Sequence, residues 1–331
     1  MTIEELIRQE TENILKRIGA NIEALILVGS FARGEGLTCQ NNAELELISD
    51  IEFLAIAKPE KLGKLNKIKP KDNNLTLNFS TRKHLKKLKP CIFTLELKNF
   101  GKVVRGDKEI LKNIPDYEYS DIAPIDGFIL LNNRIVEQLI LLKKIEDGKT
   151  IYQYDIDKGY IQLANSLLAF HKQYKSLYKE KAEALKNTLC DMCYLADKIP
   201  DFKPKAENAL NNAISGKTRP IDNQEAKEKW LELKKYFREI WLYEASVLLN
   251  DLSYNFDKTL DKFIAIPDFK ARLKGWIKLM AKGIHFGNMH NIFISSPQFL
   301  IYRNAAKLYF SDQINREKAD SVIKKWEAIV K

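Results

Sequence analysis

Two short stretches near the N-terminus combine residue types that could do chemistry together. The first is Gly29-Ser30, which ends the apolar run Ala24–Val28. The second is SDIEFLAI, in which Asp50 and Glu52 stand two residues apart at the start of another apolar run. Successive side chains of a strand point to opposite faces, so these two carboxylates are expected on one face. Side by side they repel each other unless they are protonated, hydrogen-bonded or share a cation.

The carboxylate pair has the chemistry of a magnesium site. Mg²⁺ is held in proteins by one or two carboxylates, while waters and substrate phosphates supply its other ligands. The Gly-Ser turn suits the same substrate, because backbone N–H groups and a small hydroxyl can hold phosphate oxygens where glycine leaves room. Two simpler interpretations stay open: the turn is ordinary loop punctuation, and the acids belong to the solvated face of a half-exposed sheet.

The elements that must position these residues are short strands mixed with short helices. The apolar runs predict strands over Ala24–Val28, Ile51–Ala57 and Leu75–Phe79, and helices over Thr2–Ile18 and Thr81–Leu88. Two further strands, Ile92–Leu97 and Lys102–Arg105, are predicted to form a hairpin around Asn99-Phe100-Gly101.

Beyond Ile122 the pattern changes to helical periodicity. Helices are predicted over Gly127–Ile145, Lys158–Tyr178, Glu180–Lys198, Gln224–Leu249, Phe256–Phe263, Ala271–Met280 and Ile314–Val330. The chain is therefore expected to be an α+β protein. Residues 1–118 form a domain with a mixed sheet and flanking helices, and residues 119–331 form an all-helical domain.

Composition excludes several classes of protein. Four cysteines in 331 residues are too few for a disulfide scaffold, and the apolar stretches are too short to cross a bilayer. The N-terminal segment is acidic and patterned as a helix, unlike a secretory signal. We expect a cytoplasmic protein without a membrane partner.

Positive charge is concentrated in one segment. The chain carries a net charge of +10, and Lys58–Lys89 holds eleven basic side chains against Glu60 and Asp72. Such a segment attracts polyanions, nucleic acid among them. The alternative interpretation is a solvated, lysine-rich surface with no dedicated ligand.

The two opening motifs, taken in order, resemble a known signature. GSFARGEG followed by SDIEF is similar to the Gly-Ser turn and the Asp-x-Asp or Asp-x-Glu strand of nucleotidyltransferases of the DNA polymerase β superfamily, with their minimal, kanamycin-type fold. The chain resembles most closely a prokaryotic subfamily with GGFGRGEG-like turns and NDYD-like strands. Further segments of that subfamily resemble KPCIFTLELKNFGKVVRGDKEILKNIPDYEYSDI, the LLNNR of Leu130–Arg134, and the spacing of Tyr174, Tyr178 and Lys181.

The resemblance implies an enzyme that transfers a nucleoside monophosphate from an NTP, with ATP the expected nucleotide, while pyrophosphate leaves. It implies a mixed sheet with helices on one face. Gly29 and Ser30 would hold the triphosphate, and Arg33 would contact a phosphate oxygen. Asp50 and Glu52 would hold two Mg²⁺ ions about 3.5–4 Å apart.

The third carboxylate of the family is where this chain departs from the pattern. The neighbouring strand carries Asn78, which could bind a metal through its carbonyl but cannot act as a base. Glu96 is the remaining acid for catalysis and metal binding, although it could instead pair with Lys98 or Lys102 across the predicted hairpin. Lys158, at the start of a predicted helix, is a candidate for contacting the nucleotide in a cleft between domains.

Two matters stay open at the level of sequence. The acceptor could be a small hydroxyl compound, a sugar, an RNA end or a protein side chain, and the basic stretch favours an anionic one. The alternative to an enzyme is a catalytically weak nucleotide-binding or interaction protein that keeps the fold.

The gap between Ser30 and Asp50 is longer than the family's usual spacing, so Thr38–Ile48 is expected to be an insertion, often a small hairpin in the subfamily.

Overall fold

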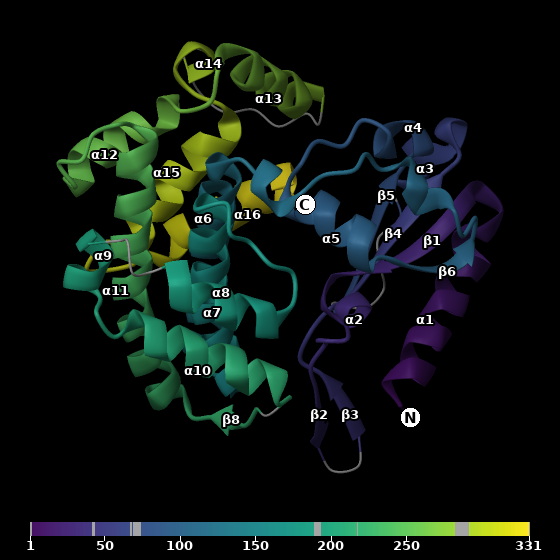
Figure 1. Cartoon of the computed structure of the whole chain (residues 1–331), viewed down its shortest axis with the longest axis horizontal. Coiled ribbons are helices and arrows are strands. Elements are labelled where there is room, and N and C mark those ends of the chain that lie inside the picture. The colour runs from purple at the N-terminus through teal and green to yellow at the C-terminus, as the bar shows by residue number, and fades with distance from the viewer. Residues whose placement is uncertain are drawn as a thin grey trace. The chain divides into compact units, whose positions relative to one another are not determined.

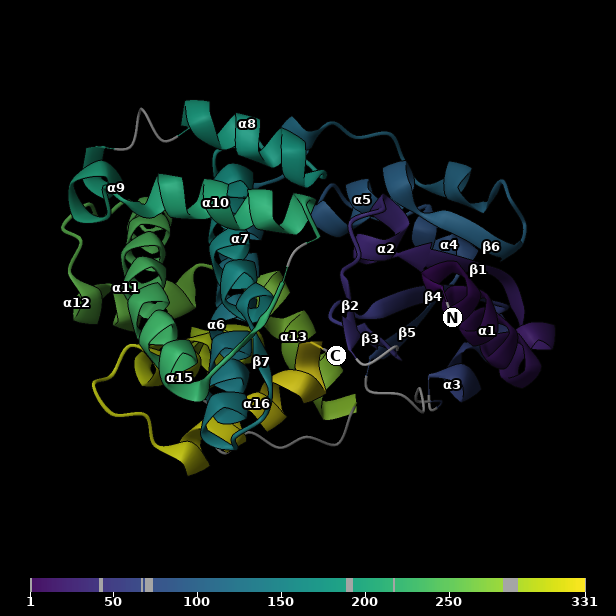
Figure 2. The same cartoon turned by 90° about the horizontal axis from the view of Figure 1, so that it is seen from below.

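The chain divides into two compact units, seen in the computed structural model of Figures 1 and 2. The structure describes residues 2–41, 44–66, 68, 74–188, 193–216, 218–281 and 291–330. The first unit comprises Met1–Ala123, Lys172–Ala182 and Leu210–Thr218, and the second comprises Pro124–His171, Glu183–Ala209 and Arg219–Lys331. The sequence predicts a single boundary after residue 118, whereas the two later segments Lys172–Ala182 and Leu210–Thr218 group with the N-terminal residues. Side chains of the first of these segments bond to Tyr119 and Glu96.

The first unit is built on a four-stranded mixed sheet with the order β5-β4-β1-β6. Its strands are β1 (Ile22–Val28), β4 (Ile51–Ala57), β5 (Leu75–Ser80) and β6 (Lys102–Gly106). Strand β4 runs parallel to β5 and antiparallel to β1, which also pairs antiparallel with β6. The helices of this unit are α1 (Ile3–Ile18), α2 (Gly29–Arg33), α3 (Leu62–Leu65), α4 (Arg82–Leu85) and α5 (Ile92–Phe100). The α+β class expected from the sequence is confirmed at this level.

One predicted element is wrong. The hairpin expected around residues 99–101 does not form, because Ile92–Phe100 is the helix α5 and only Lys102–Gly106 is a strand. That strand pairs with β1 instead. A short apolar run cannot be assigned to helix or strand by periodicity alone. Here Leu95 and Leu97 are both buried on the helix.

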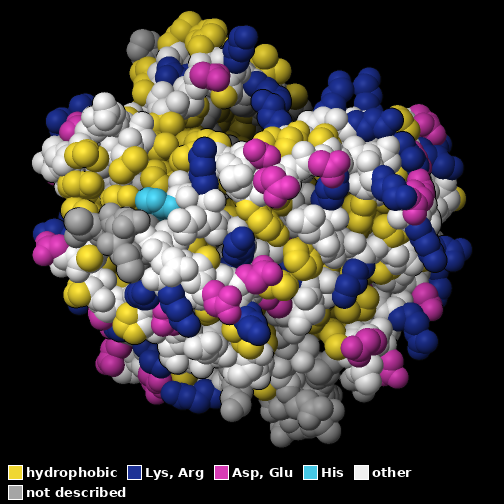
Figure 3. Space-filling model, in the orientation of Figure 1, with side chains coloured by type: hydrophobic (Ala, Val, Ile, Leu, Met, Phe, Trp, Pro, Cys, Tyr) yellow, Lys and Arg dark blue, Asp and Glu magenta, His cyan; other side chains and the backbone are white. Residues whose placement is uncertain are grey.

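Charged side chains of both signs lie among apolar ones over the face shown in Figure 3. Within the described ranges, no helix combines the length and the apolar character needed to cross a membrane.

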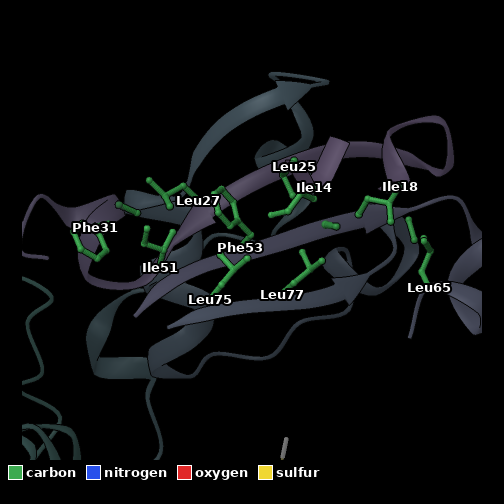
Figure 4. Close-up of a cluster of buried hydrophobic side chains, with 13 residues drawn as sticks. Ile14, Ile18, Leu25, Leu27, Phe31, Ile51, Phe53, Leu65, Leu75 and Leu77 are labelled. Atoms are coloured by element: carbon green, nitrogen blue, oxygen red, sulfur yellow. The ribbon is translucent and has the colours of Figure 1, made fainter. Parts of the chain in front are cut away.

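The sheet of the first unit has a hydrophobic core on each face. One face packs under α1 and α3, as Figure 4 shows for Ile14 and Ile18 of α1 above Phe53 and the neighbouring strand residues. The other face, which includes Ile26 and Leu54, packs under α4, α5 and the turn at Ile110–Asn113. Helices therefore cover both faces rather than the one face that the resemblance implied. The reason is that β1 and β4 are apolar at almost every position, so neither face can be left in water.

The expected insertion forms a hairpin of β2 (Thr38–Asn41) and β3 (Glu44–Leu47). Its two ends are clamped together, since Leu37 O accepts hydrogen bonds from the N–H groups of Ile48 and Ser49 at 3.1 and 3.0 Å. The Leu37 N–H also donates to Ser49 Oγ at 3.1 Å. The additional residues therefore loop out, and Asp50 follows directly at the start of β4.

The second unit is helical apart from a short pairing of β7 (Ile151–Tyr152) with β8 (Pro220–Ile221). Its helices are α6 (Pro124–Glu146), α7 (Gln153–Phe170), α9 (Cys193–Lys198), α11 (Asn223–Leu248), α12 (Phe256–Lys262), α13 (Phe269–Ala281), α14 (Asn291–Ile294), α15 (Pro297–Tyr309) and α16 (Arg316–Val330). Helices α8 (Tyr178–Thr188) and α10 (Phe202–Ile214) cross the division between the units. The sequence patterns missed α10 and α15.

The long helix predicted over Lys158–Tyr178 ends at Phe170 instead. Lys172 has a positive φ of 59°, which an α-helix cannot contain. The break releases the following segment from α7, and residues 172–182 fold onto the first unit.

A buried acid lies in the core of the second unit. Glu244 on α11 is fully buried beside Ser166 on α7. The Ser166 hydroxyl lies 2.8 Å from Gly127 O and 2.7 Å from Glu244 Oε1. A hydroxyl has one proton, and a carbonyl can only accept. The three groups are satisfied together when Ser166 donates to Gly127 and a protonated Glu244 donates to Ser166, and burial raises the Glu244 pKa to about 8.

The first prediction follows from this neutral acid. The native protein keeps the Glu244 proton up to about pH 8, whereas the unfolded chain releases it near 4.5. The stabilisation is complete below pH 4.5 and is lost as pH rises to about 8, by up to roughly 5 kcal/mol. Urea unfolding at pH 5 and pH 9 should show this loss in the wild type and a much smaller one in Glu244→Gln. Equal pH dependence in the two proteins would show that Glu244 is ionised in the core.

Candidate functional site

The Gly-Ser turn meets a carboxylate of the neighbouring strand. Strand β1 ends at Val28, which pairs with Glu52 of β4, and α2 begins at the next residue. Gly29 has φ +70°, and a Cβ atom there would lie 2.7 Å from Glu52 Oε1. A larger residue would be strained and would also collide with the carboxylate. Glycine is therefore required here by a close approach as well as by backbone conformation, which argues against ordinary loop punctuation.

The predicted acids lie at the same end of the sheet as this turn. Glu52 and Ser30 are half-buried, while Asp50 is exposed just before β4 begins. Their position follows from the antiparallel pairing of β1 with β4, which places the end of one strand beside the start of the other. The structure thus brings together Gly29, Ser30 and Glu52, with Asp50 two residues away along the chain.

Asn78 lies on the adjacent strand, on the face that carries Glu52. In the parallel pair, Glu52 is opposite Thr76 and Leu54 is opposite Asn78. Asn78 is therefore one strand away and two residues further along, and its side chain is exposed. The position is open to a ligand, but the amide brings no negative charge.

Glu96 lies on helix α5 and is held in an ion-pair network. Its Oε2 accepts a hydrogen bond from Arg33 Nη1 at 2.7 Å, and its Oε1 accepts one from the Tyr174 hydroxyl at 2.6 Å. Both carboxylate oxygens therefore have protein partners. The pairing with Lys98 or Lys102 considered for a hairpin also does not occur, because Lys98 bonds to Ile114 O and Asp116.

Arg33 is neutralised by two glutamates. Besides Glu96, Glu35 accepts from Arg33 Nε at 3.0 Å. Burial by itself would lower the Arg33 pKa, but the charge of Glu96 and the hydrogen bond to Glu35 outweigh it and the pKa is raised. These carboxylates balance the charge of Arg33, and the phosphate contact expected for it stays a prediction.

The segment 172–182 completes this network from far along the sequence. The Tyr178 N–H donates to Glu35 Oε1 at 2.5 Å, and the Tyr174 hydroxyl reaches Glu96. Tyr119 joins Ser176 by a hydroxyl–hydroxyl bond of 2.9 Å. These contacts hold the segment against α2 and α5 of the first unit.

Lys181 is a buried cation beside the network. Its side chain is 1% exposed, and its Nζ lies 5.0 Å from the ring centre of Tyr174 and 5.5 Å from that of Tyr178. No carboxylate within the described part of the chain forms a salt bridge with it. Burial and the charge of Arg33 lower the Lys181 pKa to about 8, although Glu96 and Glu35 oppose the shift. The ammonium is therefore stabilised by two aromatic faces and not by a paired acid.

Lys158 acts on a different carboxylate, and its expected contact with the nucleotide stays a prediction. It lies on α7 in the second unit, where its charge acts on Glu137. Burial would raise the Glu137 pKa, but Arg134 and Lys158 lower it to about 2. In this structure the charge of Lys158 thus helps to keep the half-buried Glu137 ionised.

Two residues of the network could not be found by local reasoning. Glu35 belongs to the GSFARGEG motif, but the motif gave it no role. Lys181 entered only through the resemblance, as part of a spacing with Tyr174 and Tyr178. Nothing in the pattern of either segment indicates that they meet.

The metal chemistry of the site rests on two carboxylates. In the ranges that the structure describes, no group of three or more His, Cys, Asp or Glu side chains is arranged to hold a metal ion. Asp50 and Glu52 fit the smaller requirement of Mg²⁺, which accepts one or two carboxylates when substrate phosphates supply further ligands.

Comparison with known proteins adds no relative. No protein-family model matches the chain, and no curated protein matches it.

The second prediction tests the structural role of Glu96. Glu96→Ala leaves the mostly buried Arg33 with one carboxylate and removes the acceptor of the Tyr174 hydroxyl. The free energy of unfolding in urea should fall by about 2–4 kcal/mol. Glu60→Ala, at an exposed glutamate, should change it by less than about 0.5 kcal/mol. Unchanged stability in Glu96→Ala would mean that the network contributes nothing to the fold.

Proposed function

We propose that the protein is a Mg²⁺-dependent nucleotidyltransferase, which moves a nucleoside monophosphate from an NTP to an acceptor. The single observation that carries this proposal is the close approach of the Glu52 carboxylate to the Gly-Ser turn, where a Cβ on Gly29 would lie 2.7 Å from Glu52 Oε1. A phosphate-holding turn and an acidic pair at one end of a sheet are what a nucleotide triphosphate with its cation requires.

The turn would hold the phosphates. The Ser30 side chain is half-buried at the start of α2, where backbone N–H groups have no helical partner. Because residue 29 has no side chain, the Glu52 carboxylate fits beside the turn, where a cation could join it to a phosphate held by the backbone N–H groups.

Asp50 and Glu52 would hold the cation. Bound Mg²⁺ would neutralise charge that develops on the phosphate oxygens during in-line displacement. The half-buried Glu52 is fixed against the turn, while the exposed Asp50 is free to meet solvent and acceptor.

Lys181 is a second candidate for a phosphate contact beside Arg33, although its side chain is 1% exposed and would have to be uncovered when the nucleotide binds. Arg33 is one helical turn from Ser30, and Lys181 is close enough to Arg33 for the two charges to interact. An oxygen of the triphosphate would supply the anion that the buried ammonium lacks among the described side chains. This contact would stabilise both the protonated lysine and the bound nucleotide.

The reaction joins an acceptor hydroxyl oxygen to the α-phosphorus and breaks the bond from that phosphorus to the β-phosphate, so pyrophosphate leaves. The hydroxyl proton passes to a carboxylate of the Asp50–Glu52 pair or to solvent. The structure does not narrow the class of acceptor, which is a small hydroxyl compound, a sugar, an RNA end or a protein side chain.

A second candidate function is nucleotide binding without efficient turnover. The lack of a third free carboxylate favours this candidate. Glu96 is hydrogen-bonded to Arg33 and Tyr174, and the adjacent strand carries Asn78 in place of an acid. Two carboxylates hold a cation more weakly than three, and an amide cannot take a proton.

The third prediction addresses turnover. Purified protein with Mg²⁺ and each α-labelled NTP, incubated with cell extract, should label an acceptor and release pyrophosphate. Asp50→Asn and Glu52→Gln should each lower this rate by about 100-fold or more, because each removes charge from the cation site. Glu60→Gln, the same change at an exposed glutamate, should keep the wild-type rate.

The outcomes separate the two candidate functions. Labelling that requires both acids supports the transferase. Calorimetric binding of Mg²⁺·NTP that requires both acids, without labelling, supports the nucleotide-binding protein. Binding and labelling that persist in Asp50→Asn would contradict both.

The fourth prediction concerns Lys181. Its lowered pKa means that the ammonium is charged below about pH 8 and neutral above it. The KM for NTP should therefore rise as pH increases through 8. Lys181→Met should raise the KM about tenfold at pH 7 and remove this pH dependence. Lys175→Met, at an exposed lysine of the same segment, is the control; a Lys181→Met protein with altered stability but normal KM would assign Lys181 to the fold alone.

A further inference from the structure

In the first unit, four strand ends that are far apart in the sequence lie side by side along one edge of the sheet. Ile22 pairs with Ala57, Ala24 with Gly106, and Ile56 with Ser80. The C-terminal ends of β4, β5 and β6 therefore lie together, beside the N-terminal end of β1. This edge is opposite to the end that carries Gly29 and Glu52.

Basic side chains crowd the segments that leave this edge. We call the following set the basic end: Lys61 and Lys64 after β4, Lys83, Lys86, Lys87 and Lys89 after β5, and Arg105 and Lys108 at the end of β6. All are exposed except the half-buried Lys61. Three more lysines of the stretch found in the sequence, Lys67, Lys69 and Lys71, lie outside the described residues. Figure 3 shows lysine and arginine side chains gathered over the part of this unit that holds α3, α4 and β6.

The acids near this edge do not neutralise the basic end. Arg82 holds Glu23 and Asp107 at 2.8 and 2.7 Å, and Lys112 holds Glu109. Among described residues, no member of the basic end forms a salt bridge. Of the two acids in the stretch Lys58–Lys89, Glu60 forms no salt bridge among the described residues and Asp72 lies outside them, so the eight cations of the basic end outnumber the acids left to balance them.

The composition of the surface indicates the kind of partner. The described residues of segments 58–66 and 82–89 include no exposed large hydrophobic side chain. A protein interface has an apolar core and is depleted in lysine, and a membrane-binding surface inserts apolar side chains. A phosphate backbone requires only cations, and lysine as a point charge suits contacts that do not depend on sequence.

We propose that the basic end docks the phosphate backbone of a nucleic acid. Four strand ends at about 4.8 Å spacing give a front of about 14 Å, along which a duplex presents one negative charge per about 1.7 Å. The seven residues of β4 put about 20 Å between this front and the Asp50–Glu52 pair. Nucleic acid and nucleotide would therefore bind to the same unit without competing. The inference is independent of the proposed transferase activity.

The test is the salt dependence of binding to labelled 20-base-pair duplexes of RNA and of DNA, measured by fluorescence anisotropy between 50 and 200 mM salt. The triple variant Lys83→Glu, Lys86→Glu, Lys87→Glu should weaken binding at least tenfold and reduce the slope of log K against log salt by about 3. The triple variant Lys227→Glu, Lys235→Glu, Lys324→Glu changes the net charge equally at exposed helix positions of the second unit, and should bind as the wild type does. The RNA and DNA arms identify which duplex is preferred.

A second variant protects the test against misfolding. Arg105→Glu with Lys108→Glu reaches the basic end from another strand, and should lower the slope by about 2 with an unchanged thermal melting curve. Equal weakening by the control triple variant would overturn the proposal, as would equally tight binding of polyglutamate. Displacement of the duplex by Mg²⁺·ATP would overturn the placement of the two ligands at opposite ends.

Discussion

The antiparallel pairing of β1 with β4 is the constraint on which the candidate site depends. It places Val28 opposite Glu52, so the turn that follows β1 must pass the carboxylate at close range. Only a residue without Cβ fits there, and its positive φ also starts α2. The hairpin insertion leaves this geometry intact because its ends are bonded to each other through Leu37. A ligand bound at the Gly-Ser turn would therefore lie next to the Glu52 carboxylate.

A second constraint is the compensation of buried charge around Arg33. Two glutamates balance the guanidinium, and tyrosines from a segment near residue 178 complete their hydrogen bonds. Breaking one member of such a network leaves the others desolvated and unpaired, which is costly in a protein interior. Glu96 therefore has a structural task, and Lys181 is the cation whose charge the described carboxylates leave without a salt bridge.

Charge is also separated along the sheet of the first unit. Acidic side chains stand at one end, and the basic end stands about 20 Å away. Opposite charges held apart in this way do not neutralise each other at physiological ionic strength, where screening acts within about 8 Å. Under the two proposals made above, a cation with a nucleotide would bind at one end and a polyanion at the other.

The sequence by itself determined the local features of this protein. The apolar runs marked three strands of the sheet, and the residue types at the Gly-Ser turn and at Asp50 and Glu52 marked one end of it, because strand periodicity and glycine geometry are local properties. Helix α5 was predicted as a strand, since its short apolar run fits the period of a strand as well as that of a helix. The partners of Arg33, the burial of Lys181 and the meeting of three basic segments were decided only by the tertiary structure. Each depends on contacts between residues far apart in the chain, which no local pattern encodes.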